Sequence, residues 1–237
     1  EYGDDTAIFG FGTTGSNVSM SNLVSNAGVV ATDTTGVGSA RKGLGACGYG
    51  GDKGIFGYGW TSSAVSITNL VSNAGVVATD TTGVGTARQY IGATEYGEDK
   101  GIFGFGSNGG YQSLTNLVSN AGVVATDTTG VGTARWGLEG CGYGYDKGIF
   151  GFGFDGSRVS MTNLVSNAGV VATDVTGVGT ARYSLGATQY GGDKGIFGYG
   201  NASLTAVTNL VSNAGVVATD TTGVGTARDQ LAACSFN

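Results

Sequence analysis

The feature that most constrains this chain is an internal repeat of 47 residues. The phrase TNLVSNAGVVATDTTGVGTAR occurs five times, and only Ser21, Ser39 and Val175 depart from its common spelling. A second phrase built on IFG recurs between the copies, with its isoleucine at Ile8, Ile55, Ile102, Ile149 and Ile196. Units of this length bury their apolar faces only against neighbouring units. We therefore expect one domain spanning residues 1–237.

Each unit has the pattern of four short β-strands. Between residues 89 and 127, taken as an example of one unit, the alternating or β-branched runs are 89–96, 100–105, 113–119 and 122–127, and they are separated by turn-forming residues. The chain has 48 glycines among its 237 residues and no proline, which favours many strands joined by tight turns. Four strands in a unit of this length form the blade of a β-propeller. The predicted fold is all-β, a five-bladed β-propeller with four antiparallel strands per blade.

The two ends of the sequence indicate that the ring of blades closes. Residues 1–3 match the repeat position of residues 48–50, and residues 235–237 match the same position again. We therefore expect the C-terminal strand to pair beside the N-terminal strand and close the ring. Closure would remove the free sheet edges that otherwise promote aggregation.

Composition excludes several classes of function. Histidine is absent, which removes histidine-based triads, acid–base catalysis and metal ligands. The abundant serines and threonines have no base beside them, so we expect no enzyme, no catalytic residue, no metal and no cofactor. The net charge is −6 without a basic stripe, which argues against nucleic acid. No apolar run of 18 residues and no leader before Glu1 is present, so neither membrane insertion nor a signal peptide is expected.

The three cysteines occupy one position of the repeat. They are Cys47, Cys141 and Cys234, and the other two units have Thr94 and Thr188 there. An exchange of cysteine for threonine indicates a small, half-buried position. The odd count and the absence of CxxC spacing argue against a disulfide framework or a zinc site. A disulfide between Cys47 and Cys234 on neighbouring blades is the less favoured alternative.

The order of residues in each unit resembles a degenerate kelch repeat. The resemblance rests on Arg41-x-x-Leu44-x-Ala46, then Ile-Phe-Gly-Tyr-Gly at 55–59, a variable loop and a strand ending near 69–73. It covers the whole chain and implies a propeller whose blades begin after the arginine with an inner strand. Here the glycine pair is Gly-x-Gly, and valine and alanine stand in place of the downstream tyrosine and tryptophan. The repeats also resemble repetitive propeller segments of virus or phage structural proteins, which implies an extracellular or virion-associated location.

Positions that differ between the units stand out against the repeated scaffold. They lie in the loop after the second strand, in the pair after the repeated arginine, and in the hairpin around Glu95, Glu98 and Tyr145. A kelch-like strand order places the first two sets on one face. Rigid aromatic rings with polar neighbours are typical of recognition surfaces, whereas the alternative is loops that vary without a ligand. The candidate ligand-binding residues are Trp60, Tyr90, Tyr111, Trp136, Phe154, Tyr183, Lys42, Gln89, Asp155, Arg158 and Asp229.

The repeated charged residues have a structural interpretation. The aspartates equivalent to Asp33 and the arginines equivalent to Arg41 recur in all five units. Aspartates commonly bond turn amides and pair with arginine. We therefore favour contacts between blades over five equal sites for a sugar or an ion.

These observations favour a non-enzymatic recognition module. Its expected partner is a glycan or a protein on a host or cell surface, bound through the diversified loop face. The alternative is a structural or spacer domain of a virion or tail fibre that has no specific ligand. Copies this similar also fit a designed or reconstructed repeat protein, and the oligomeric state is left open.

Overall fold

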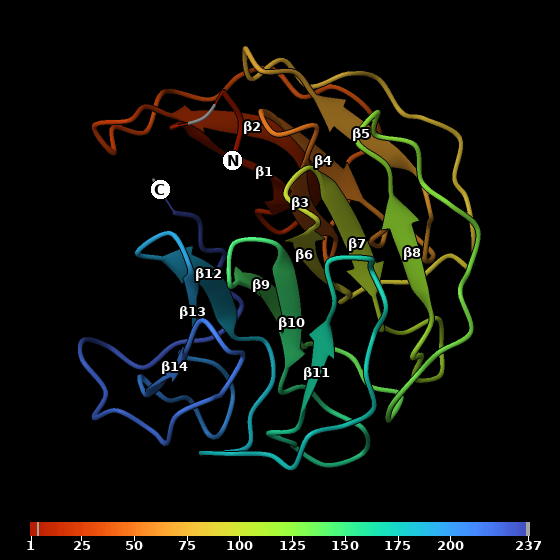
Figure 1. The fold of residues 1–237 in the computed structure, drawn as a ribbon. Helices are drawn as coiled ribbons and strands as arrows, with labels where there is room; N and C mark the ends of the chain where they lie inside the picture. The colour runs from red at the N-terminus through yellow and green to blue at the C-terminus, as the bar shows by residue number, and fades with distance from the viewer. Residues whose placement is uncertain (4, 236–237) are drawn as a thin grey trace.

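A computed structural model describes residues 1–3 and 5–235, and this part of the chain is all-β. Its first sheet pairs β1 (Ala7–Thr13) with β2 (Asn17–Val24). Four three-stranded antiparallel sheets follow, and Figure 1 shows their inner strands β3, β6, β9 and β12 gathered towards a common centre. The strands are β3 (Gly45–Tyr49), β4 (Lys53–Gly57), β5 (Thr68–Val71), β6 (Gly92–Tyr96), β7 (Lys100–Gly104), β8 (Thr115–Val118), β9 (Glu139–Tyr143), β10 (Lys147–Gly151), β11 (Thr162–Val165), β12 (Gly186–Tyr190), β13 (Lys194–Gly198) and β14 (Thr208–Val211).

The prediction of four strands per unit is wrong, because the fourth segment pairs with the third through separate bridges. In the second unit Val71 pairs with Val77 and Thr68 pairs with Thr81, so the register changes by one residue between the two bridges. The Asn69 side chain fills this irregularity by donating Nδ2 to the Ala78 carbonyl over 3.0 Å. A side chain thus replaces part of the backbone ladder, and each of these sheets has three strands.

Neighbouring sheets pack by placing a phenylalanine of one onto a glycine of the other. The Phe56 ring of β4 covers Gly10 of β1, where an added Cβ would lie 3.0 Å from Phe56 Cζ. The ring also meets Phe11 edge to face, with centroids 5.3 Å apart. Only glycine leaves room for this approach. The same contact recurs where Phe103 covers Gly57, Phe150 covers Gly104 and Phe197 covers Gly151.

A buried arginine between two sheets makes the second repeated contact. The Arg135 guanidinium lies 4.3 Å from the centre of the Phe105 ring in the preceding sheet. Its Nε donates to the Phe152 carbonyl of the next sheet over 2.8 Å. Phe152 has a left-handed φ of 65°, which costs a bulky residue roughly 1–2 kcal/mol. The charge-assisted hydrogen bond from arginine helps to offset this strain.

An asparagine and an aspartate complete this contact, which we call the Arg–Asn–Asp clamp. Arg135 Nη2 donates to Asn163 Oδ1 over 2.6 Å, and Asn163 Nδ2 donates to Asp174 Oδ1 over 2.9 Å. Asp174 also accepts from the Thr133 hydroxyl of the preceding unit over 2.7 Å. The structural interpretation of the repeated arginines and aspartates is confirmed at four interfaces. The other three clamps are Arg41/Asn69/Asp80, Arg88/Asn116/Asp127 and Arg182/Asn209/Asp220.

The structure does not show the expected ring closure. Arg228 is exposed, and the hydrogen bond of its side chain in the described part of the chain goes to the Thr226 carbonyl of its own unit. Asp33 of the first unit is also exposed. Residues 231–234 line the central cavity, and residues 231–235 form no strand. The predicted closing strand also includes residues 236–237, which lie outside the described residues.

Candidate functional site

Five of the six predicted aromatic side chains meet in one group, which we call the aromatic cluster. Trp136 is central: its ring lies 5.0 Å from Tyr90, 5.8 Å from Phe154 and 5.1 Å from Tyr183 between centroids. Phe154 also lies 5.5 Å from Tyr183 and 6.2 Å from Tyr111. The rings come from the third, fourth and fifth units, so the fold brings together residues that are far apart in the sequence. Tyr111 is 41% exposed, and the other four rings are half-buried.

Backbone pairing between the two variable loops holds this cluster in place. Trp136 and Phe154 exchange backbone hydrogen bonds of 3.1 and 2.9 Å, so the two loop sets lie on the same face. Tyr90 has a left-handed φ of 51°, and its amide donates to the Gly43 carbonyl of the preceding unit. The Gly137 amide in turn donates to the Tyr90 carbonyl over 3.0 Å. The rings therefore project from backbone that is tied both within and between units.

Trp60 and Lys42 lie outside the aromatic cluster. Their backbones pair with each other over 2.8 and 3.1 Å, as the backbones of Trp136 and Phe154 do. No ring of the described residues packs against Trp60 within aromatic contact distance. The loop of Trp60 is held instead by Asn17, whose Nδ2 donates to the Trp60 and Thr61 carbonyls. The structure thus separates the two tryptophans.

A chain of polar side chains borders the cluster. Arg158 donates Nε to the Asn201 carbonyl over 3.1 Å and Nη2 to Asn201 Oδ1 over 3.2 Å. Asn201 Nδ2 donates to Asp229 Oδ2 over 2.9 Å. Arg158 pairs with Phe154, and Asn201 pairs with Tyr183, which places this polar chain directly beside two rings. Sequence reasoning missed Asn201 as a site residue, although it occupies the variable position equivalent to Phe154.

Two further predicted residues contribute to the loops themselves. Asp155 Oδ1 accepts from the Ser157 amide over 3.1 Å and from the Ser157 hydroxyl over 3.0 Å, so this carboxylate stabilises its own turn. Gln89 exchanges backbone hydrogen bonds with Ser107 over 2.9 Å. Both residues support the loop face, and neither side chain joins the ring contacts.

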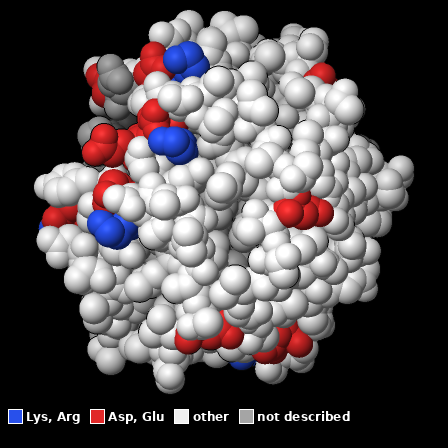
Figure 2. Space-filling model, turned by 45° about the vertical axis from the view of Figure 1, so that its right-hand side comes forward, with Lys and Arg blue, Asp and Glu red and all other residues white. Residues whose placement is uncertain are grey.

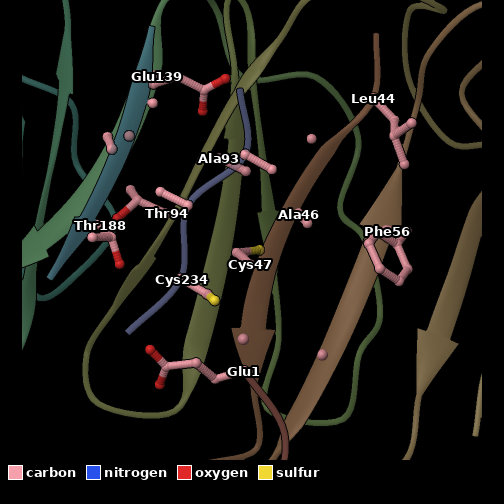
Figure 3. A pocket seen from close by; sticks show the side chains of 18 of the residues that line it. Glu1, Leu44, Ala46, Cys47, Phe56, Ala93, Thr94, Glu139, Thr188 and Cys234 are labelled. Atoms are coloured by element: carbon pink, nitrogen blue, oxygen red, sulfur yellow. The ribbon is translucent and has the colours of Figure 1, made fainter. Parts of the chain in front are cut away.

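The inner strands surround a second candidate site, a central cavity of about 530 Å³. Figure 3 shows Glu139 and Glu1 at its two ends, with Cys47 and Cys234 between them. Burial raises the pKa of Glu139 to about 8, although a hydrogen bond from Gly140 opposes this shift. Burial, and then the charge of Glu1, also raise the pKa of Glu95. No lysine or arginine is among the described residues that line the cavity.

The three cysteines are free thiols. Burial is the main cause that raises the pKa of Cys141 to about 12, and it also raises the pKa of Cys47 and of Cys234. Thiols that hold their protons are poor nucleophiles and poor metal ligands. Across the described residues, no group of three or more Cys, Asp or Glu side chains is arranged to hold a metal ion.

Most of the lysine and arginine side chains pair with an aspartate. On the face shown in Figure 2, basic groups lie next to acidic groups and most of the surface is uncharged. One repeated pair joins Lys53 Nζ to Asp52 Oδ1 over 2.5 Å, and Asn73 donates to the same aspartate. Equivalent pairs are Lys100–Asp99, Lys147–Asp146 and Lys194–Asp193. In addition, no helix of the described chain has the length and apolar content that crossing a membrane requires.

Comparison of the chain with protein-family models and with curated proteins finds no match to either. The kelch-like pattern and the similarity to viral propeller segments therefore remain resemblances. The repeated antiparallel sheets and their clamps are established from the chain itself, without assignment to a family.

Proposed function

We propose that the five sheets are the blades of a β-propeller. Support comes from the four formed interfaces, which repeat the same phenylalanine–glycine contact and the same Arg–Asn–Asp clamp. Because the contacts are the same at each interface, each sheet is rotated in the same way relative to the one before it. The sheets therefore follow one another around the central cavity. This is how a propeller presents loops of several blades on one face.

We further propose that the protein is a non-enzymatic recognition module for a surface glycan, bound at the aromatic cluster. The observation that carries this proposal is the meeting of five rings from three units beside the Arg158–Asn201–Asp229 chain. The C–H face of a sugar ring packs on an aromatic ring, and its hydroxyl groups bond to polar side chains at the edge. A few fixed polar groups around an apolar surface are typical of small-ligand sites. An extracellular or virion-associated location would suit such a ligand.

Glycan-array binding tests this proposal, with two tryptophan variants as a matched pair. Trp136→Ala removes the centre of the cluster, whereas Trp60→Ala removes a tryptophan of the same face that lies outside it. We expect binding to selected glycans that Trp136→Ala abolishes and Trp60→Ala leaves within about twofold, a difference of less than roughly 0.5 kcal/mol. Equal loss in both variants, or no glycan bound, would contradict the proposed site. Binding only to a protein on cells would assign the same face to a protein partner.

Intrinsic fluorescence provides a second readout. The chain has two tryptophans, so Trp60→Phe leaves Trp136 as the only indole. A glycan that stacks at the cluster should change the emission of this variant with a saturable dependence on concentration. An unchanged spectrum at a glycan concentration that saturates the array signal would place binding elsewhere.

The alternative is a structural or spacer domain, and one observation favours it. Variable loop residues bond to the next loop along the face: Asn17 bonds to the Trp60 loop, and Arg158 bonds to Asn201. Such residues would vary as matched pairs that brace neighbouring blades. In that case Trp136→Ala lowers the melting temperature, and neither the arrays nor cell binding gives a signal.

A further inference from the structure

We propose that the uncovered ends of the first and fifth units are binding partners for each other. They would form a fifth interface of the same design as the other four, and residues 231–235 would be the inner strand of the first unit. This inference rests on the propeller arrangement proposed above and is independent of glycan binding. It follows from groups on both ends that match the formed interfaces but pack against no partner sheet within residues 1–3 and 5–235.

The first match is an exposed phenylalanine and an uncovered glycine. Phe9 of β1 is 36% exposed, whereas the equivalent Phe103 is 0% exposed because it covers a glycine of the preceding sheet. Gly198 of β13 is equivalent to that covered glycine, and of the described residues an added Cβ there would meet only Thr208. At Gly151, in contrast, an added Cβ would lie 2.7 Å from the covering phenylalanine. Phe9 and Gly198 are therefore the two halves of a fifth contact.

The second match is a divided clamp. Arg228 already lies 4.0 Å from the centre of the Tyr199 ring, as the other clamp arginines lie over their rings. In the first unit Asn22 Nδ2 already donates to Asp33 Oδ1 over 2.8 Å, as in the formed clamps. Phe11 has a left-handed φ of 63°. In the formed interfaces the equivalent residue has the same conformation, and its backbone carbonyl accepts from the clamp arginine. The fifth unit thus offers a cation, and the first unit offers the matching acceptors.

The third match is the position of residues 231–235. Leu231 lies over Gly186 of β12, with Cδ1 3.1 Å from an added Cβ, as Ile91 lies over Gly45. The Gln230 amide donates to the Ser184 carbonyl over 2.9 Å and continues a series of bonds that runs between successive units. One more hydrogen bond, from the Gly43 amide to the Gln230 carbonyl, would make this series circular. The earlier members are Tyr90 to Gly43, Gly137 to Tyr90 and Ser184 to Gly137.

The first sheet also has the free edge that this segment fits. Among the strands that the structure describes, β1 pairs only with β2, whereas β4, β7, β10 and β13 each pair on both sides. The Ser235 hydroxyl already donates to the carboxylate of Glu1. The segment is therefore bonded to the fifth unit at one end and to the first unit at the other. This favours the chain's own segment over a second copy as the occupant of the edge.

Matched variants at the fifth and at a formed interface test the proposal. We expect Arg228→Ala to lower the melting temperature by as much as Arg135→Ala, and Phe9→Ala to lower it by as much as Phe103→Ala. If the interface is absent, Arg228→Ala changes the melting temperature little, because Arg228 is exposed. That outcome would overturn the proposal, and Gly198→Ala would then also be tolerated.

Two measurements on the unaltered protein complete the test. Hydrogen exchange should protect the amides of residues 8–10 as strongly as those of residues 55–57, and fast exchange at 8–10 would overturn the proposal. Light scattering should give the mass of one chain, with a melting temperature independent of concentration. A doubled mass would assign the interface to a second copy and overturn closure within one chain. Neither readout involves glycan, so failure here and failure of the recognition function are distinguishable.

Discussion

Glu139 makes the stability of the protein depend on pH in a direction that can be calculated. It begins β9 at a position where three other units have glycine, and its carboxyl group lies in the central cavity. Burial raises its pKa from 4.5 to about 8. Between these values the folded protein retains a proton that the unfolded chain releases, so stability falls as pH rises from about 4.5 to about 8.

The magnitude follows from the size of this shift. At 1.36 kcal/mol per pH unit, the change corresponds to at most roughly 5 kcal/mol. The side chain is only half-buried by exposed area and the cavity admits water, so we expect about 1–2 kcal/mol after solvent screening. Glu139→Gln keeps the shape of the side chain and removes its titration. The advantage of the variant over the wild type should grow from pH 5 to pH 9 and reach about 1–2 kcal/mol at pH 9.

Urea denaturation at pH 5, 7 and 9 measures this difference in the free energy of unfolding. Glu98→Gln is the control, because Glu98 is exposed in the hairpin of the third unit. The difference between Glu139→Gln and the wild type should change with pH by more than the difference that this control shows. If the advantage of Glu139→Gln does not grow between pH 5 and 9, the Glu139 carboxyl group is ionised in the folded protein and the reasoning is refuted.

Three other predictions concern the interfaces between sheets. Asn116→Ala removes the acceptor of a buried arginine and should lower the free energy of unfolding by about 2–4 kcal/mol, whereas Asn120→Ala at an exposed turn should cost less than about 1 kcal/mol in the same urea titration. Burial acts to raise the pKa of Asp127, but hydrogen bonds outweigh it and hold this pKa below its usual value. Stability is therefore lost as pH falls through the lowered pKa. Asp127→Asn should weaken the loss of folded protein at low pH, which circular dichroism measures. Gly104→Ala would place a Cβ 3.0 Å from a phenylalanine ring of the next sheet and should cost about 1–3 kcal/mol by calorimetry, while Gly110→Ala meets open space and should have little effect.

The repeat alone was sufficient to predict the all-β class, the period and the position of most strands. Its predicted strand 100–105 is found as Lys100–Gly104, and the boundary differs because Phe105 is left-handed where its carbonyl meets the clamp arginine. The strand predicted from residue 89 begins at Gly92, since Tyr90 turns to bond the preceding unit. Both differences arise from contacts between units. No local pattern of hydrophobic residues contains them.

The candidate site was likewise predictable from the sequence only in part. Variation between units identified Tyr90, Trp136 and Tyr183 as loop residues, and the structure places Tyr90 and Tyr183 against Trp136. Sequence reasoning could not separate Trp60 from these rings, because the distance between loops depends on how successive sheets are turned. Asn201 was missed because an asparagine in a loop is unremarkable until Arg158 and Asp229 are seen to bond to it.

The clamp has a consequence for how such a chain can be cut and lengthened. Arg135 comes before the sheet that holds Asn163, so every clamp crosses the boundary between two copies of the repeat. A single copy therefore has a donor half at one end and an acceptor half at the other, and identical fragments could assemble head to tail. Each added copy extends the array by one more joint of the same kind. In a closed ring all five junctions become equivalent, and a circular permutant opened between Gly109 and Gly110 should rebuild the same set of joints from a different starting point.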